Sequence, residues 1–144
     1  MSENFVCVSG YFDPLHVGHL AYFEEAAKYG RLIVILNSDA AAKRKKGFVF
    51  MPFVERKRLI EALKCVDRVE AVDDADGTVC KALARIRPTY FAKGGDRGPD
   101  NTPEQEQCGL LGIQMLWSMG GDNKAQSSSK LVAESWDSLM GHLG

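Results

Sequence analysis

The sequence lacks three features that would each point to a particular class of protein. No two of its four cysteines form a CxxC pair, which argues against a disulfide framework or a zinc site and predicts reduced core thiols. No apolar run reaches the roughly 18 residues that span a bilayer. The first residues, MSENFVCVSG, have neither the charged start nor the long apolar core of a signal peptide. We therefore expect a cytoplasmic protein with no membrane partner.

An excess of charge of either sign is also missing. The formal net charge is −1 and the isoelectric point is about 6.3, so no basic field favours binding to nucleic acid. Hydrophobic residues make up 45% and charged residues 26% of the chain, as in an ordinary soluble globular protein. We find no repeat, linker or shift in composition. Residues 1–144 are therefore expected to form one domain, which is long enough to bury a core.

Short apolar runs alternate with helical patterns along the chain. Strands are expected at residues 5–9, 31–36, 66–72, 89–92 and 113–117. Helices are expected at residues 17–29, 54–64, 79–86, from 103 to about 109, and from 127 to about 139. Strand, helix and strand within about 30 residues form a βαβ unit. The alternation predicts an α/β fold, a single Rossmann-like doubly wound domain with a five-stranded parallel sheet.

Two of the three histidines, His16 and His19, lie within SGYFDPLHVGHL, residues 9–20. A predicted strand precedes this stretch and a predicted helix follows it, so the pair lies at a helix N-terminus. Unpaired backbone N–H groups and the helix dipole favour phosphate there, and residues i and i+3 share one face. Gly18 allows a ligand to approach the backbone closely. Two ordinary histidines beside a turn are the alternative, but the strand–turn–helix context favours a phosphate site.

Four consecutive cations, residues 43–46, form the densest basic cluster in the chain. They follow Asn37, Ser38 and Asp39, which come directly after the second predicted strand. Ligands of open α/β sheets bind outside the carboxyl ends of the strands, so we expect this run to bind a polyanion. A solvated charge run is the alternative. We interpret residues 43–47 as an extended loop, in which Lys45 and Lys46 point in opposite directions, so that Lys46 contributes to phosphate binding and Lys45 matters little.

Several further features are individually weaker. Arg56 lies in the first turn of a predicted helix, where a cation is unfavourable, and this suggests a role beyond helix formation; a surface arginine is the alternative. The KGGD segment, residues 93–96, follows a strand and permits close approach of a ligand. Asp73, Asp74 and Asp76 are expected in a solvated loop. The serines at 127–129 are ordinary helix-capping residues or a second anion site.

The stretch GYFDPLHVGH, residues 10–19, resembles the GxFDxxHxGH signature of the cytidylyltransferase-like nucleotidyltransferases. NSDAAAKRKKG, residues 37–47, and KGGD are similar to segments of heptose-1-phosphate adenylyltransferases in that family. QSSSKLV, residues 126–132, partly matches a triphosphate-binding element, but Lys124 lies where glycerol-3-phosphate cytidylyltransferases carry a preceding arginine. The resemblance extends from Phe5 to about Val132 and implies the strand order 3-2-1-4-5.

The resemblance implies an enzyme that transfers a nucleoside monophosphate from CTP or ATP to a phosphorylated small sugar or polyol and releases pyrophosphate. The catalytic residues would be His16, His19 and Lys46. The nucleotide would contact Tyr11, Phe12, Gly18, Lys124, Ser127, Ser128 and Ser129. Asp39, Lys43 and Arg56 would bind the acceptor or other phosphates, and Asp13 or Asp96 would orient Mg²⁺ or another divalent cation.

Other interpretations stay open from the sequence alone. A nucleotide-binding sensor or regulatory module without turnover is favoured by the altered segment before the serines, whereas the intact histidine pair favours an enzyme. A fragment of a class I aminoacyl-tRNA synthetase would also carry an HxGH element, but the short, near-neutral chain argues against it. The base, the acceptor and the formation of a homodimer are not decided by these residues.

Overall fold

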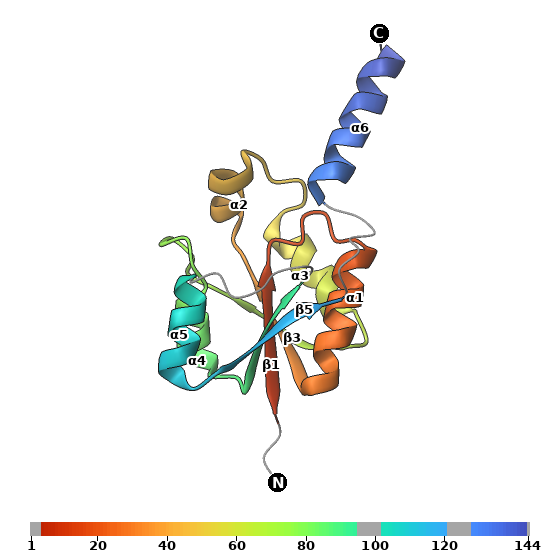
Figure 1. The fold of residues 1–144 in the computed structure, drawn as a ribbon. Helices are drawn as coiled ribbons and strands as arrows, with labels where there is room; N and C mark the ends of the chain where they lie inside the picture. The colour runs from red at the N-terminus through yellow and green to blue at the C-terminus, as the bar shows by residue number, and fades with distance from the viewer. Residues whose placement is uncertain (1–3, 95–101, 121–127, 144) are drawn as a thin grey trace.

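Five parallel strands run through the middle of the molecule in the order β3-β2-β1-β4-β5, as Figure 1 shows. The structure is a computed structural model that describes residues 4–94, 102–120 and 128–143. The strands are β1 (Phe5–Gly10), β2 (Arg31–Leu36), β3 (Val66–Ala71), β4 (Tyr90–Gly94) and β5 (Gln114–Met119). The predicted α/β class, the parallel five-stranded sheet and the strand order are all confirmed.

Helices cover both faces of this sheet. They are α1 (Val17–Ala26) with the short 3-10 helix η1 (Ala27–Tyr29), α2 (Asp39–Lys46), α3 (Phe53–Glu61), α4 (Cys80–Ile86), α5 (Pro103–Leu111) and α6 (Ser128–Leu143). In Figure 1, α1 and α3 lie on one side of the sheet and α4 and α5 on the other, whereas α6 extends away from it. Among the described residues, no helix has the length and apolar content to cross a membrane.

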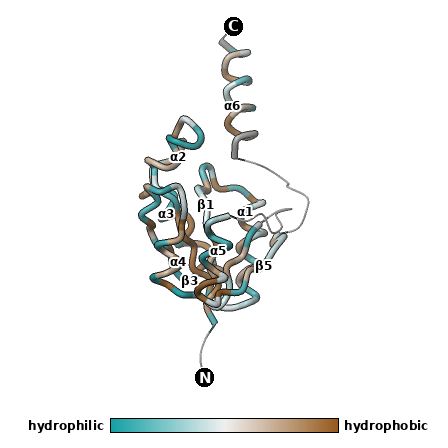
Figure 2. The backbone as a smooth tube through the Cα atoms, turned by 60° about the vertical axis from the view of Figure 1, so that its left-hand side comes forward, coloured by the Kyte–Doolittle hydropathy of each residue, from teal (hydrophilic) through white to brown (hydrophobic). Residues whose placement is uncertain are grey.

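Alternate residues of the central strands lie on opposite faces of the sheet and belong to two separate apolar cores. From β2, Leu32 and Val34 pack toward α1 and α3, while Ile33 and Ile35 pack toward α4 and α5. A strand buried on both faces reads as a continuous apolar run, which is why β2 was predicted with its observed bounds. Figure 2 shows the hydrophobic residues gathered along the sheet. All four cysteines are free thiols, and burial raises the pKa of Cys7 to about 12.

The basic run is helical, so the prediction of an extended loop at residues 43–47 was wrong. Ser38 caps α2 by accepting a hydrogen bond from the Ala41 N–H at 3.1 Å, and Gly47 ends the helix with a left-handed φ of 86°. Three consecutive alanines favour a helix, and cations in its last turn face the negative end of its dipole. Lys45 and Lys46 are therefore about 100° apart around a helix and do not lie on opposite sides of a strand.

Candidate phosphate-binding site

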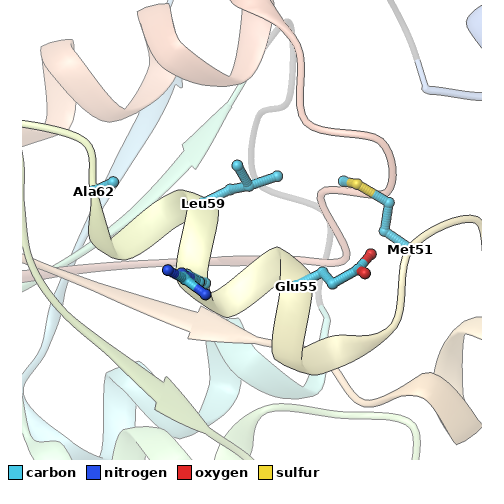
Figure 3. Close-up of a pocket in the computed structure, with 5 residues that line it drawn as sticks. Met51, Glu55, Leu59 and Ala62 are labelled. Carbon is cyan, nitrogen blue, oxygen red and sulfur yellow. The ribbon is translucent and has the colours of Figure 1, made fainter.

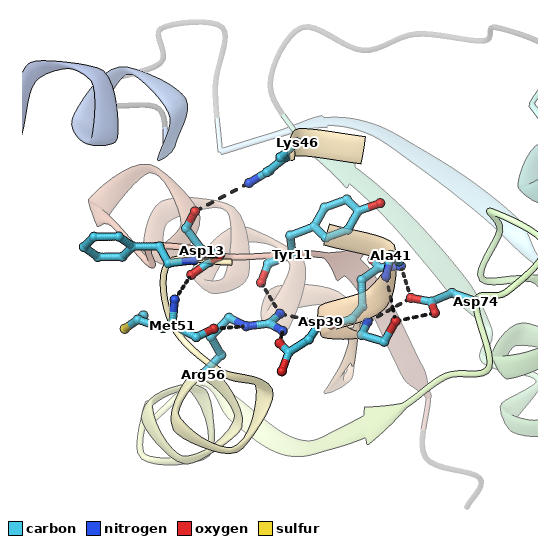
Figure 4. Close-up of polar contacts among 11 residues, drawn as sticks. Tyr11, Asp13, Asp39, Ala41, Lys46, Met51, Arg56 and Asp74 are labelled. Carbon is cyan, nitrogen blue, oxygen red and sulfur yellow. Dashed lines mark hydrogen bonds and ion pairs between the residues drawn. The ribbon is translucent and has the colours of Figure 1, made fainter. Parts of the chain in front are cut away.

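The candidate site lies at the carboxyl end of β1, in the centre of the sheet. The segment between β1 and α1 contains Tyr11, Phe12, Asp13 and His16. Figure 4 shows Tyr11 and Asp13 of this segment together with Lys46 of α2. β2, the next strand in the sequence, pairs with β1 on one side. β4, which follows β3 in the sequence, pairs with β1 on the other side. Ligands of open α/β sheets bind at this reversal of strand order. The sequence prediction placed the histidines at this position.

His16 and His19 cap α1 reciprocally. Nδ1 of His16 accepts a hydrogen bond from the Gly18 N–H at 3.0 Å, and Nδ1 of His19 accepts one from the His16 N–H at 3.2 Å. This is a capping box in which two imidazoles take the positions that Ser and Glu usually occupy. The rings stack at 3.7 Å between centroids. The two side chains are thus held together by the backbone of the helix that they begin.

These contacts determine which ring nitrogen carries hydrogen. A nitrogen that accepts from a backbone N–H has no proton of its own, so in each neutral ring the hydrogen lies on Nε2. Burial, followed by the charges of His16 and Lys46, lowers the pKa of His19 to about 3. His19 is therefore a neutral hydrogen-bond donor at physiological pH. It is suited to stabilising an anion without transferring a proton.

The Phe12 ring packs against the His19 ring and orients it. Its backbone has a positive φ of 52°, which is rare for a residue with a bulky side chain. Its buried ring meets His19 edge to face at 4.8 Å and Phe23 at 4.9 Å. A Cβ on Gly10 would lie 2.8 Å from the Phe12 ring, so only glycine leaves room for it. The strained backbone at Phe12 is thus held in place by packing on several sides.

Lys46 lies beside the loop that leads to the histidine pair. Its ammonium lies 3.5 Å from the backbone oxygen of Asp13 and 5.3 Å from the centre of the Tyr11 ring. Burial lowers the pKa of Lys46, and its charge in turn lowers the pKa of His19. Lys45 also lies 5.3 Å from the Tyr11 ring centre. Lys43, one turn earlier in α2, is exposed.

Arg56 is fully buried, so the alternative of a surface arginine is wrong. Its guanidinium donates to the backbone oxygens of Met51, Tyr11 and Asn37 at 2.9, 2.8 and 3.0 Å, and to the carboxylate of Asp39. Figure 4 shows the guanidinium between these groups. Arg56 therefore connects the segments that follow β1, β2 and α2. Its predicted contact with a phosphate would need some of these hydrogen bonds to be exchanged.

Asp13 is also buried, and its carboxylate holds a neighbouring segment of the chain. One oxygen accepts from the Phe50 N–H at 2.7 Å and the other from the Met51 N–H at 2.6 Å. Within the described residues, no group of three or more His, Cys, Asp or Glu side chains could hold a metal ion. The side chains described do not fit a protein-built Mg²⁺ site.

The prediction that Asp74 lies in a solvated loop was wrong. Its side chain lies buried beside Ser38, whereas Asp73 and Asp76 are exposed as expected for a solvated loop. Three of the four residues 73–76 are aspartates, and their spacing does not indicate which side chain is buried. The useful signal was its position just after a strand that neighbours β2, which brings it near the start of α2.

Several predicted site residues are described only partly or not at all. Asp96, Lys124 and Ser127 lie outside the described residues. Ser128 and Ser129 begin α6 close to where the helix was predicted, but their side chains are not described.

A pocket of about 340 Å³ lies along α3 (Figure 3). It is lined by Met51, Glu55, Arg58, Leu59 and Ala62. Its lining is mainly apolar and does not include His16, His19 or Lys46. The residues predicted to be catalytic therefore do not line this pocket.

The chain is similar in sequence to known proteins over most of its length. Bifunctional protein HldE of Erwinia tasmaniensis is 37% identical over 123 residues, which cover 83% of this chain and 24% of that protein. Bifunctional protein HldE of Hydrogenovibrio crunogenus is 38% identical over 124 residues, with the same shares of the two chains. The chain thus spans about a quarter of the length of these curated relatives.

A solved structure has a similar fold over most of both chains. The lipopolysaccharide core biosynthesis protein from Thermoplasma volcanium GSS1 superposes with a TM-score of 0.69 at 29% identity, covering 81% of this chain and 95% of that one. The model of the cytidylyltransferase-like family matches residues 7–133, which include the sheet, the histidine pair and α2. The chain therefore belongs to the cytidylyltransferase-like family.

Proposed function

We propose that this protein transfers a nucleoside monophosphate from a nucleoside triphosphate to a phosphorylated small molecule and releases pyrophosphate. The observation that carries the proposal is the pair of imidazoles that cap α1 through Nδ1, with the Lys46 ammonium 3.5 Å from the backbone oxygen of Asp13 in the preceding loop. A helix N-terminus with these donors is a site for phosphate oxygens. The family membership of the chain supports the same reaction class.

In this reaction a phosphate oxygen of the acceptor attacks the α-phosphorus in line. The bond between the α-phosphorus and the oxygen that bridges to the β-phosphate breaks, and its electron pair leaves with pyrophosphate. Such a step needs positioning and charge stabilisation more than a covalent nucleophile. Nε2–H groups of His16 and His19 would donate to the triphosphate oxygens on which negative charge increases. No proton has to leave either ring.

Lysines of α2 would hold the two reactants together. Acceptor phosphate and α-phosphate both carry negative charge, so they repel each other at bonding distance. A cation between them removes this repulsion, and Lys46 is the partly buried lysine of α2 whose ammonium contacts the loop before the histidines. Lys43 is exposed in the same helix and can contact an acceptor that extends outward. The aromatic ring of Tyr11 keeps the Lys46 ammonium near the site.

Mg²⁺ remains part of the proposal as a companion of the triphosphate. Mg²⁺ commonly keeps several waters and binds phosphates with few protein ligands, so it does not require a carboxylate cage. When bound, it would neutralise charge on the leaving pyrophosphate. The carboxylate of Asp13 already accepts hydrogen bonds from two backbone N–H groups. The main ligands of Mg²⁺ would therefore be phosphate oxygens and water.

ATP with a sugar phosphate is the substrate pair that we favour. Residues 37–47 and 93–96 resemble segments of heptose-1-phosphate adenylyltransferases, and the curated relatives are Bifunctional protein HldE. CTP with a polyol phosphate is the second candidate, because the signature at residues 10–19 is shared with cytidylyltransferases. A sensor without turnover would bind the triphosphate but release no pyrophosphate.

The proposed function is tested by a panel of substrates. Purified protein is incubated with each of ATP, CTP, GTP and UTP, together with several sugar and polyol phosphates and Mg²⁺, and pyrophosphate is measured. We expect release that depends on both substrates and is highest with ATP and a sugar phosphate. Tight triphosphate binding without release for any pair would contradict the proposal and favour the sensor.

Replacing His16 separates its capping role from its catalytic role. Asparagine is a good N-cap residue and keeps an acceptor near the position of Nδ1, but it has nothing at the position of Nε2. We expect His16→Asn to keep its melting temperature while turnover falls by about two orders of magnitude, the scale for losing one preorganised donor. His16→Ala should lose a similar amount of turnover and also about 1 kcal/mol of stability. Turnover near normal in His16→Asn would remove the proposed role.

His19 should remain neutral across the physiological range. Its pKa is lowered to about 3, so we expect its C2–H resonance in NMR spectra not to shift between pH 8 and pH 5. The resonance is assigned by its loss in His19→Gln. An unfolded chain takes up this proton near pH 6.5, so the wild type should lose stability as the pH falls from about 6.5 toward 3. A titration midpoint between pH 5 and 7 would contradict a neutral donor.

Lys45 and Lys46 should both contribute, but unequally. Both ammonium groups lie beside Tyr11, whereas only Lys46 is partly buried and contacts Asp13. We expect Lys46→Ala to raise the KM for the acceptor and to lower kcat, and Lys45→Ala to give a smaller increase in KM alone. Lys64→Ala is the control, because it removes an exposed charge just before β3, at the opposite end of the sheet. Equal effects at positions 45 and 46 would indicate that only net charge matters.

A further inference from the structure

The helix that carries the lysines has little apolar contact with the rest of the protein. Of its eight residues only Ala41 and Ala42 are buried, and both are small. Figure 2 shows α2 as largely hydrophilic. A helix of this length has no stability of its own, and tertiary contacts have to hold it. Polar groups must therefore determine where α2, and with it Lys46, lies.

Asp74 holds the N-terminal end of α2. Its Oδ2 accepts from the Ser38 N–H at 2.8 Å and from the Asn37 side chain at 3.0 Å, and its Oδ1 accepts from the Ser38 hydroxyl at 2.6 Å. That hydroxyl is the cap of α2. Arg44 of the same helix donates to the backbone oxygen of Asp74 at 3.1 Å. The buried carboxylate of Asp74 thus orients the Ser38 cap, and the backbone oxygen of Asp74 contacts the last turn of α2.

Asp13 holds the segment that leaves α2. Its two carboxylate oxygens accept the backbone N–H groups of Phe50 and Met51, and its backbone oxygen accepts from Lys46. Asp13 also lies three residues before His16 in the loop that follows β1. This aspartate therefore relates the histidine loop directly to the exit of α2.

We propose that Asp13 and Asp74 are positioning residues, which fix the basic helix so that the ammonium of Lys46 stays at the Asp13 backbone oxygen, in the loop that leads to the histidine pair. The inference rests on the proposed function, because it assigns the two aspartates to the same phosphate site. Hydrogen bonds donated to these carboxylates replace the apolar packing that α2 lacks. Neither aspartate touches substrate in this arrangement. Both act through the lysines.

Asn replacements test this with little change in shape. An Asn side chain keeps one acceptor oxygen and places an NH₂ group where the second carboxylate oxygen accepted a hydrogen bond. Asp13→Asn and Asp74→Asn should each lower kcat/KM on the order of 10- to 100-fold, the scale for misplacing a catalytic group by about 1 Å. Asp73→Asn is the matched control, because its exposed carboxylate is adjacent in sequence and pairs with Lys81. It should leave kcat/KM unchanged.

A double-mutant cycle with Lys46→Ala distinguishes positioning from a general loss of structure. If Asp13 acts through Lys46, then Asp13→Asn should lower kcat/KM less than about twofold once Lys46 has been removed. Melting temperatures are measured for every variant. Equal effects of Asp13→Asn with and without Lys46, or wild-type kcat/KM in both aspartate variants, would overturn the proposal. If Asp13→Asn does not fold, the same cycle with Asp74→Asn decides the outcome.

Binding of inorganic pyrophosphate, measured by calorimetry, gives a readout that does not need turnover. We expect Asp13→Asn, Asp74→Asn and Lys46→Ala to weaken binding, and Asp73→Asn to bind as the wild type does. If the wild type binds pyrophosphate but shows no turnover with any substrate pair, the proposed function fails and the positioning role is judged from binding alone. If turnover is present and both aspartate variants match Asp73→Asn in binding and in kcat/KM, positioning fails while the proposed function stands.

Discussion

The carboxyl end of the sheet depends on one buried guanidinium. Arg56 reaches from α3 under the site and donates to the backbone oxygens of Tyr11, Asn37 and Met51, which belong to three different segments. A buried charge is tolerated only when it is paired and hydrogen-bonded, and Asp39 completes that requirement. Arginine suits this position because its planar fork donates in several fixed directions at once, which a lysine does not. The loops above the sheet are thereby fixed relative to one another.

Structural and functional roles coincide in the same groups at this site. The two imidazoles begin α1 through their Nδ1 atoms and thereby present Nε2–H to a ligand. Phe12 contributes to the apolar core and at the same time fixes the His19 ring. A substitution that removes an Nδ1 acceptor would therefore disturb both the helix start and the orientation of the donor. Such coupling keeps the donors preorganised before the ligand arrives.

The strands and their order were predicted correctly, whereas the buried polar contacts near the site were not. Apolar runs and strand–helix alternation gave the five strands, and the family resemblance gave their order, because both depend on patterns that are visible along the chain. The helical state of residues 39–46 was missed, since four adjacent cations indicate a solvated segment unless the Ser38 cap and the three alanines are weighed first. Burial of Arg56 and Asp74 was not predictable, because each is stabilised by partners distant in sequence.

The strand order also has a consequence for how the chain folds. Contacts between β1, β2 and β3 join segments that follow one another, whereas β4 must return to pair Phe91 with Cys7. Loop-closure entropy makes the second type of contact slower to form. His16, Lys46, Arg56 and Asp74 all precede β4 in the chain. The part of the chain before β4, which contains these residues, can therefore assemble from local contacts while the protein is still being synthesised. Insertion of β4 beside β1 then completes the sheet.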